Sequence, residues 1–287
     1  MRTRVCAAAL LGLALVTAGL AAQTKGVPDL KGRDIRVVTE GGYPPLSFLD
    51  PVTGKPAGLD SELLAEIGKR LNARITWSKA AWADLLNSVH EGRFDIAANG
   101  ITITEDRREQ VDFSDPYLVS QQRMVARADE ARFSNAAQLG SGAALLLGAQ
   151  AGAAGFYAAA YNVLDGDEKS PRIMLVPSAA LAVRGLLDGA VDCVLMEEAG
   201  ARGFVGGSGG KLKVIGEALA REPLALAITP GSDLTAAVNA AIRSMREDGT
   251  LVRLATRWFY DKADRHGIAE GMAPAGGGTA AAGKRAP

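Results

Sequence analysis

A group of polar and charged residues lies between positions 99 and 117, in the stretch NGITITEDRREQVDFSDPY. Thr104 is a typical helix N-cap residue, so the pattern predicts a helix that begins there and carries Arg107 in its first turn. A planar guanidinium beside amide and hydroxyl groups suits the capture of a small anion. The neighbouring Arg108 is predicted to be a solvated surface charge. The groups that precede the helix are Asn99, Gly100 and Thr102.

The elements that must position these residues alternate between strand and helix patterns. Apolar residues at helical spacing predict a helix over 60–71, with Leu63, Leu64, Ile67 and Leu71 on one face. Strands separated by helices favour an α/β fold with mostly parallel sheets. The predicted strands are 35–40, 73–78, 94–99, 122–128, 144–149, 172–177, 192–196, 212–216 and 223–229. The other predicted helices are 82–92, 153–162 and 179–188, with a long amphipathic segment at 233–259.

Composition narrows the class of protein. The chain has 287 residues, 48% apolar and 22% charged, which is enough for one large or two medium domains with a real core. The formal net charge is zero, so the sequence lacks the basic character typical of nucleic-acid binding. We therefore expect no nucleic-acid partner.

The N-terminus has the pattern of an export signal. Arg2 and Arg4 precede a short apolar run that small residues close, which predicts a signal peptide over 1–22. Cys6 precedes that run, too early for a lipid-bearing cysteine at the cleavage point. Cys193 then stands alone in the mature chain, so no internal disulfide forms. We expect a soluble exported protein of the periplasm, with a disordered tail over 271–287.

Other motifs carry little. The glycine cluster 206–211, GGSGGK, resembles a phosphate-binding loop, but its spacing is wrong and it precedes a strand. His90 and His266 have no ligand-like spacing to an acid or a cysteine. We predict no metal site and no cofactor.

The order of the motifs resembles the bacterial extracellular solute-binding proteins of family 3, the amino-acid receptors of ABC importers. The motifs that carry the resemblance are TEGGYPPLSF, GLDSELLAEIGKRL, WADLLNSVHEGRFDIAANGITITEDRREQVDFSDPY and GAVDCVLMEE. The resemblance implies a type II periplasmic binding protein, two α/β lobes joined by a two-strand hinge with the ligand between them. Lobe 1 would comprise 33–122 plus 227–265, and lobe 2 would comprise 127–222.

The resemblance also implies roles for individual residues. Arg107 would bind the ligand carboxylate, and Glu197, where the family usually has aspartate, would bind the α-ammonium. Tyr43 and Trp82 would flank the ligand side chain, and Glu40 matches a position that often carries an acid in receptors for basic or polar amino acids. Asn99 and Thr102 would add polar contacts, and Gly100 would let backbone N–H groups approach the ligand.

Each of these roles has an alternative. Arg107 could be a capping or surface charge. Glu197 could be a rim carboxylate at a helix start, with Glu198 as the competing ligand residue. Trp82 could be an ordinary core residue, and Glu40 could cap a loop at the surface.

One stretch departs from the family pattern. Where the family usually has hydroxyl residues before the first helix of lobe 2, this chain has Gly152, Ala153 and Ala154. Their backbone N–H groups could still bind an anion at a helix N-terminus. The ligand would nevertheless lose a side-chain hydrogen bond, worth about 1 kcal/mol.

The sequence therefore predicts a monomeric receptor that captures a polar or basic amino acid by cleft closure and delivers it to an ABC permease. Binding without catalysis is the main hypothesis. The alternatives are an enzyme similar to cyclohexadienyl dehydratase on the same fold and a sensor input module.

Overall fold

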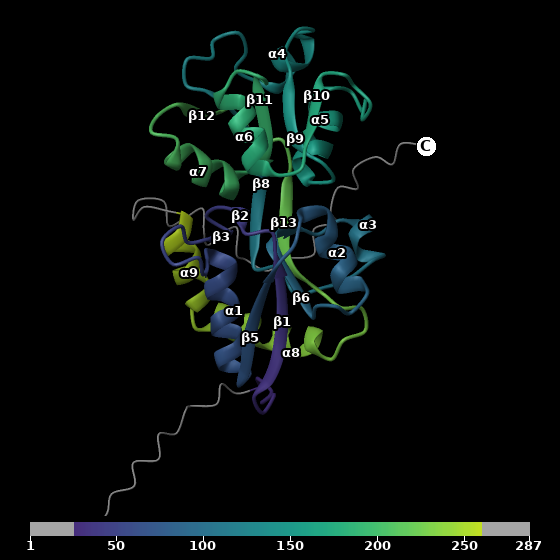
Figure 1. The fold of residues 1–287 in the computed structure, drawn as a ribbon, viewed down its shortest axis with the longest axis vertical. Coiled ribbons are helices and arrows are strands. Elements are labelled where there is room, and N and C mark those ends of the chain that lie inside the picture. Colours follow the sequence, from purple (N-terminus) through teal and green to yellow (C-terminus); the bar gives the residue numbers. More distant parts are fainter. Residues whose placement is uncertain (1–25, 260–287) are drawn as a thin grey trace, which may run out of the picture.

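The computed structural model describes residues 26–259, which form two lobes, one above the other (Figure 1). The predicted signal peptide, 1–22, and the predicted tail, 271–287, lie outside the described residues, as does the end of predicted lobe 1. Within residues 26–259, no helix combines the length and the apolar character needed to cross a membrane.

The lower lobe in Figure 1 is built on a parallel sheet. Strand β1 (Arg33–Thr39) pairs with β5 (Ala73–Lys79) on one side and β6 (Ile96–Thr102) on the other. The helices of this lobe are α1 (Leu59–Arg70), α2 (Trp82–His90), α3 (Glu105–Arg108), α8 (Leu234–Glu247) and α9 (Thr250–Phe259). Four short strands complete it, namely β2 (Gly42–Tyr43), β3 (Ser47–Leu49), β4 (Pro56–Ala57) and β7 (Asp112–Phe113).

The upper lobe has a similar group of parallel strands, which β8 (Leu118–Arg127) and β13 (Arg221–Ile228) join to the first group in one sheet. Strand β9 (Leu147–Gln150) lies between β10 (Ile173–Val176) and β11 (Cys193–Glu197). Strand β12 (Leu212–Ile215) runs antiparallel to β8 in the same sheet. The helices are α4 (Ala136–Ser141), α5 (Ala154–Val163), α6 (Ala179–Leu187) and α7 (Glu198–Gly207).

Two strands connect the lobes. The antiparallel pair β8 (Leu118–Arg127) and β13 (Arg221–Ile228) meet between Leu118–Gln121 and Arg221–Leu224. Above this contact β8 pairs with β11 and β12, and below it β13 pairs with β6 and β7. The lobe boundaries predicted from the sequence fall in these two strands and stay a prediction.

Apolar side chains account for the helices that cover the sheets. The predicted face of α1, with Leu63, Leu64, Ile67 and Leu71, is fully buried. The long segment 233–259 supplies the last two helices, α8 and α9, and Gly249 between them has φ +75° and ends the first helix. Helices α4 and α7 were not predicted from the sequence; both are rich in alanine and glycine, and α4 has only six residues.

Candidate ligand-binding site

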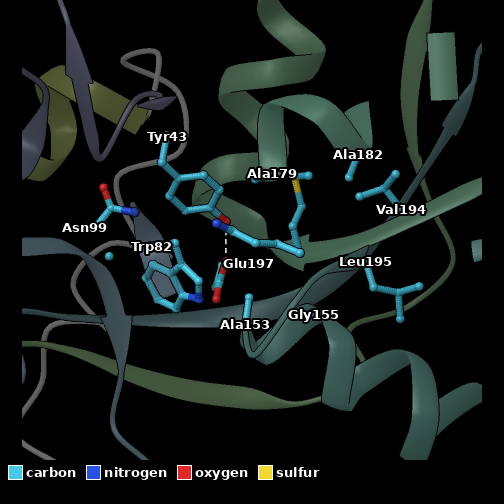
Figure 2. Close-up of a pocket in the computed structure, with 13 residues that line it drawn as sticks. Tyr43, Trp82, Asn99, Ala153, Gly155, Ala179, Ala182, Val194, Leu195 and Glu197 are labelled. Carbon is cyan, nitrogen blue, oxygen red and sulfur yellow. Dashed lines mark hydrogen bonds between the residues drawn. The ribbon is translucent and has the colours of Figure 1, made fainter. Parts of the chain in front are cut away.

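A cavity lies between the lobes where the carboxyl ends of several strands meet (Figure 2). Its volume is about 30 Å³, and one water-sized group needs about 10–15 Å³. A larger molecule can therefore enter only if the lobes move apart. The lower lobe contributes Tyr43, Trp82, Asn99 and Gly100, and the upper lobe contributes Gln150, Ala153, Gly155, Ala179, Ala182, Val194, Leu195, Met196 and Glu197.

Arg107 is a buried cation that bridges the two lobes. The Thr104 hydroxyl accepts from its backbone N–H at 3.3 Å, which fixes the start of α3. Its guanidinium donates to the Thr102 carbonyl at 2.8 Å and to the Gly152 carbonyl of the upper lobe at 3.0 Å, and it lies 5.4 Å from the centre of the Trp82 ring. Burial lowers the pKa of Arg107, and the nearby carboxylates of Glu197 and Glu222 oppose that shift. Arg107 is therefore not a solvated surface charge.

Glu197 is the acid of its pair that faces the cavity. It ends β11, is 7% exposed, and accepts a hydrogen bond from the Tyr43 hydroxyl of the lower lobe (Figure 2). Burial raises the pKa of the Tyr43 phenol, and the Glu197 charge raises it further. Glu198 is instead ion-paired with Arg202 on α7 at 2.8 Å.

Glu40 is also buried, and it lies next to the cavity residues Asn99 and Gln150. It accepts hydrogen bonds from the Gln150 amide of the upper lobe at 3.1 Å and the Asn99 amide at 3.4 Å. Burial raises the pKa of the Glu40 carboxyl, and the two amides offset part of that shift. Glu40 therefore faces the interior between the lobes and does not cap a surface loop.

Gly100 lines the cavity, but its backbone N–H is already used. It donates to the Asp60 carboxylate at 2.9 Å, and the Tyr117 hydroxyl donates to the other oxygen at 2.6 Å. Burial raises the pKa of Asp60 to about 6. The expected approach of this N–H to a ligand is therefore wrong. Glycine is needed for a different reason: φ is +62°, and a Cβ would lie 2.5 Å from Leu46.

The stretch Gly152–Ala154 contributes backbone groups only. Ala153 is the N-cap of α5 and makes no side-chain cap hydrogen bond, and the helix begins at Ala154. The first N–H groups of a helix have no partner within it, so they can receive an anion. Gly152, with φ +69°, turns its carbonyl to Arg107.

Helix α7 packs against the loop that carries Tyr43. A Cβ on Gly200 would lie 2.4 Å from the Tyr43 hydroxyl, and one on Gly203 would lie 2.4 Å from the Pro44 carbonyl. Phe204 lies 6.2 Å from the Tyr43 ring, centre to centre. Two glycines one turn apart thus let the upper lobe approach the lower lobe closely.

Six of the predicted site residues line the cavity, namely Tyr43, Trp82, Asn99, Gly100, Ala153 and Glu197. Glu40, Thr102, Arg107 and Gly152 join them through hydrogen bonds, and Ala154 follows Ala153 as the first residue of α5. Sequence reasoning missed Gln150, Asp60 and the pair Gln122 and Glu222. The sequence offered one signal, because Gln122 and Glu222 lie at the predicted boundaries of lobe 1 and lobe 2. Their chemistry becomes visible only when the lobes are placed.

Two α/β lobes joined by two strands, with charged groups facing a buried cavity between them, define a hinged two-lobed binding protein. Residues 35–261 match the bacterial extracellular solute-binding proteins, family 3, and the chain belongs to that family. The family predicted from the sequence is thereby confirmed.

Comparisons with single proteins agree. The chain is 30% identical to the L-cystine-binding protein TcyJ of Escherichia coli over 224 residues, covering 77% of this chain and 80% of that protein. The solved arginine-, lysine-, histidine-binding protein ArtJ of Geobacillus stearothermophilus matches with a TM-score of 0.72 and 28% identity, covering 81% of this chain and 99% of that one. The predicted type II fold is confirmed by such neighbours.

An enzyme is also among the similar proteins. Cyclohexadienyl dehydratase of Pseudomonas aeruginosa is 29% identical over 190 residues, covering 66% of this chain and 68% of that protein.

Proposed function

We propose that this protein is an exported receptor that captures a polar or cationic amino acid between its lobes and delivers it to an ABC permease. The observation that carries the ligand class is the set of charges around the cavity. Among the described residues that line it or hydrogen-bond across it, Arg107 is the one cation, and Glu40 and Glu197 are both buried acids.

The charges suggest how an amino acid would lie. Arg107 would pair with the α-carboxylate, helped by the N-terminus of α5. Glu197 would pair with the α-ammonium. Glu40 then needs a positive or hydrogen-bonding side chain, since an uncompensated buried charge is costly. Tyr43 and Trp82 support the same class, because aromatic faces attract cations by about 0.5–2 kcal/mol.

The names of the similar proteins point to two ligand types, cystine and the cationic amino acids. Both carry a second positive group. Cystine also carries a second carboxylate, which would need a second cation. Among the described residues, Arg107 is the one cation that hydrogen-bonds across the cavity, and the charge of Lys79 acts on Glu40. We therefore place arginine and lysine ahead of cystine, and all three ahead of glutamate.

We propose binding without catalysis. The curated relatives with the highest similarity are named as binding proteins, which supports this view. The similarity to a dehydratase keeps an enzyme as the second hypothesis, with Glu197 as its general acid. The Glu197 side chain already accepts a hydrogen bond from Tyr43.

Export completes the proposal. Processing close to Gln23 would release the protein into the periplasm, where the permease is reached. Intact-mass measurement on protein from the exported fraction tests it, and a mass that includes residues 1–20 would contradict it.

The ligand class is tested by calorimetry with arginine, lysine, histidine, cystine, glutamine, leucine and glutamate on the wild type and on Glu40→Gln. We expect arginine or lysine to bind tightest and Glu40→Gln to reduce that preference. If glutamate or leucine binds best, or if the variant leaves the ranking unchanged, the charge argument is wrong. Dehydration of a cyclohexadienyl substrate by the wild type would favour the enzyme.

A further inference from the structure

A third carboxylate approaches the cavity from a strand that connects the lobes. Glu222 lies on β13, and one of its oxygens is 3.3 Å from the Thr102 hydroxyl. A Glu197 oxygen lies 3.4 Å from the same hydroxyl. A threonine hydroxyl has one proton, so it can donate to only one of the two carboxylates at a time. The two acids thus compete for this hydroxyl, although Glu197 also accepts a hydrogen bond from Tyr43.

Among the described residues, no charged donor forms a hydrogen bond with Glu222. The charged and titratable groups that face it are Glu197 on β11, Arg107 beyond β6, and Tyr43 on β2. The hydrogen bonds of the Arg107 guanidinium go to two backbone carbonyls. Burial raises the pKa of Glu222, and the Glu197 charge raises it further, because two nearby carboxylates resist carrying charge together.

A buried acceptor stands beside this pair. Gln122 on β8 is fully buried, and its amide nitrogen donates to Glu222 at 2.8 Å. The oxygen of the same amide has no hydrogen-bond partner among residues 26–259. A buried acceptor without a donor is costly, so a ligand that brings one gains affinity there.

We propose that Glu222, Glu197 and the Gln122 amide oxygen together receive the primary ammonium group of the ligand. An ammonium has three N–H donors and no acceptor, which matches two carboxylates and one amide oxygen. Glu222 is then a ligand-binding residue on the hinge, and it links occupation of the site to the relative position of the lobes. This inference rests on the proposed function.

Glu222→Gln is the main test. The substitution keeps the shape and an acceptor for Gln122 and removes the charge. The probe is whichever of arginine, lysine, histidine and cystine binds the wild type tightest in calorimetry at pH 7. We expect Glu222→Gln to weaken binding by about ten- to a hundredfold, the range for a hydrogen bond to a charged group. Glu198→Gln, whose carboxylate pairs with Arg202, serves as the matched control and should bind within about threefold of wild type.

Proton exchange separates a binding role from a structural one. Calorimetry in phosphate and in Bis-Tris between about pH 7 and pH 6 should show that the wild type releases more protons on binding the probe as the pH falls, because a nearby ammonium favours the charged form of Glu222, whose pKa burial raises. Glu222→Gln should release fewer. If that variant does not fold, Glu222→Asp replaces it, and its shorter carboxylate should weaken binding several-fold.

The outcomes separate the two proposals. Wild-type affinity and proton release in a folded Glu222→Gln would overturn the role of Glu222 and leave the proposed function intact. If none of the four amino acids binds the wild type, both proposals fail.

Discussion

The two sides of the cavity are built differently. The lower side presents polar and aromatic side chains, including Arg107, Asn99 and Trp82. The upper side presents mostly backbone and small or apolar groups around Ala153, with Glu197 as its charged residue. The difference suggests that the lower side selects by charge, whereas the upper side selects by fit and completes the site when the lobes close. Each substitution below tests this difference between the two sides of the cavity.

Removing the lower cation should have the largest effect. Arg107→Ala would leave a ligand carboxylate unpaired in a closed cavity, at a cost of about 2–5 kcal/mol. Calorimetry should show a loss of affinity of at least thirtyfold while circular dichroism stays unchanged. Arg108→Ala is the control, because that side chain is exposed and lies 5.9 Å from the Phe113 ring. Equal effects of the two substitutions would refute the role of Arg107.

The contribution of Asp60, which lies behind the lower side of the cavity, to the free energy of unfolding should depend on pH. Asp60 has a raised pKa of about 6 in the folded protein against 3.8 for the free group. Between these values the folded state holds a proton that the unfolded state has lost, so the contribution of Asp60 to stability falls as pH rises. Urea unfolding should show the stability of wild type minus that of Asp60→Asn decreasing by about 1–3 kcal/mol from pH 4 to pH 7.

The subtraction matters for that measurement. Carboxylates such as Asp95 and Asp192 have lowered pKa values and lose stability on acidification, in the opposite direction. They are common to both proteins and cancel. A difference that stays flat with pH would contradict the role given to Asp60.

A methyl group on the upper side should hinder closure. Gly200→Ala would place a Cβ against the Tyr43 hydroxyl, and overpacking of this kind costs about 1–3 kcal/mol. We expect weaker binding of the probe amino acid and a larger radius of gyration in small-angle scattering. Gly206→Ala on the same helix is the control, since its Cβ would meet nothing within 4 Å. If Gly200→Ala and Gly206→Ala have the same radius of gyration with the probe bound, the contact between Gly200 and Tyr43 does not limit closure.

Giving the upper side a hydroxyl should have the smallest effect. Ala153→Ser would add an N-cap to α5 and a donor near the ligand carboxylate, each worth about 1 kcal/mol. Thermal melting should rise by a few degrees and affinity should increase about fivefold. Ala153→Gly carries no hydroxyl and should leave affinity unchanged, although glycine is itself a better N-cap residue than alanine. A serine variant that binds no better would show that the α5 N–H groups already satisfy the ligand.

The sequence predicts the fold class because its strand and helix patterns alternate and its motifs keep the order of a known family. Through the resemblance to that family, it also points to Arg107 and Glu197 as candidate ligand-binding residues. It does not predict the partners of these residues. Asp60 reaches Gly100 and Gln150 reaches Glu40 only through tertiary packing, and no short-range pattern encodes such pairs. The need for glycine at Gly200 of α7 becomes evident only in the structure, where Tyr43 packs against this residue.

The path of the chain through β8 and β13 sets an order of assembly. The upper cores draw on one continuous stretch, from Met124 to Leu219. The main lower core joins β1 to α8 and α9, at opposite ends of the described chain. A polypeptide that emerges N-terminus first can therefore complete its upper lobe while β1 and α1 still lack the helices that cover them. The lower lobe, which carries Arg107, is complete only after the last helices have been made, so the half of the cavity that holds this cation would be the last part to form.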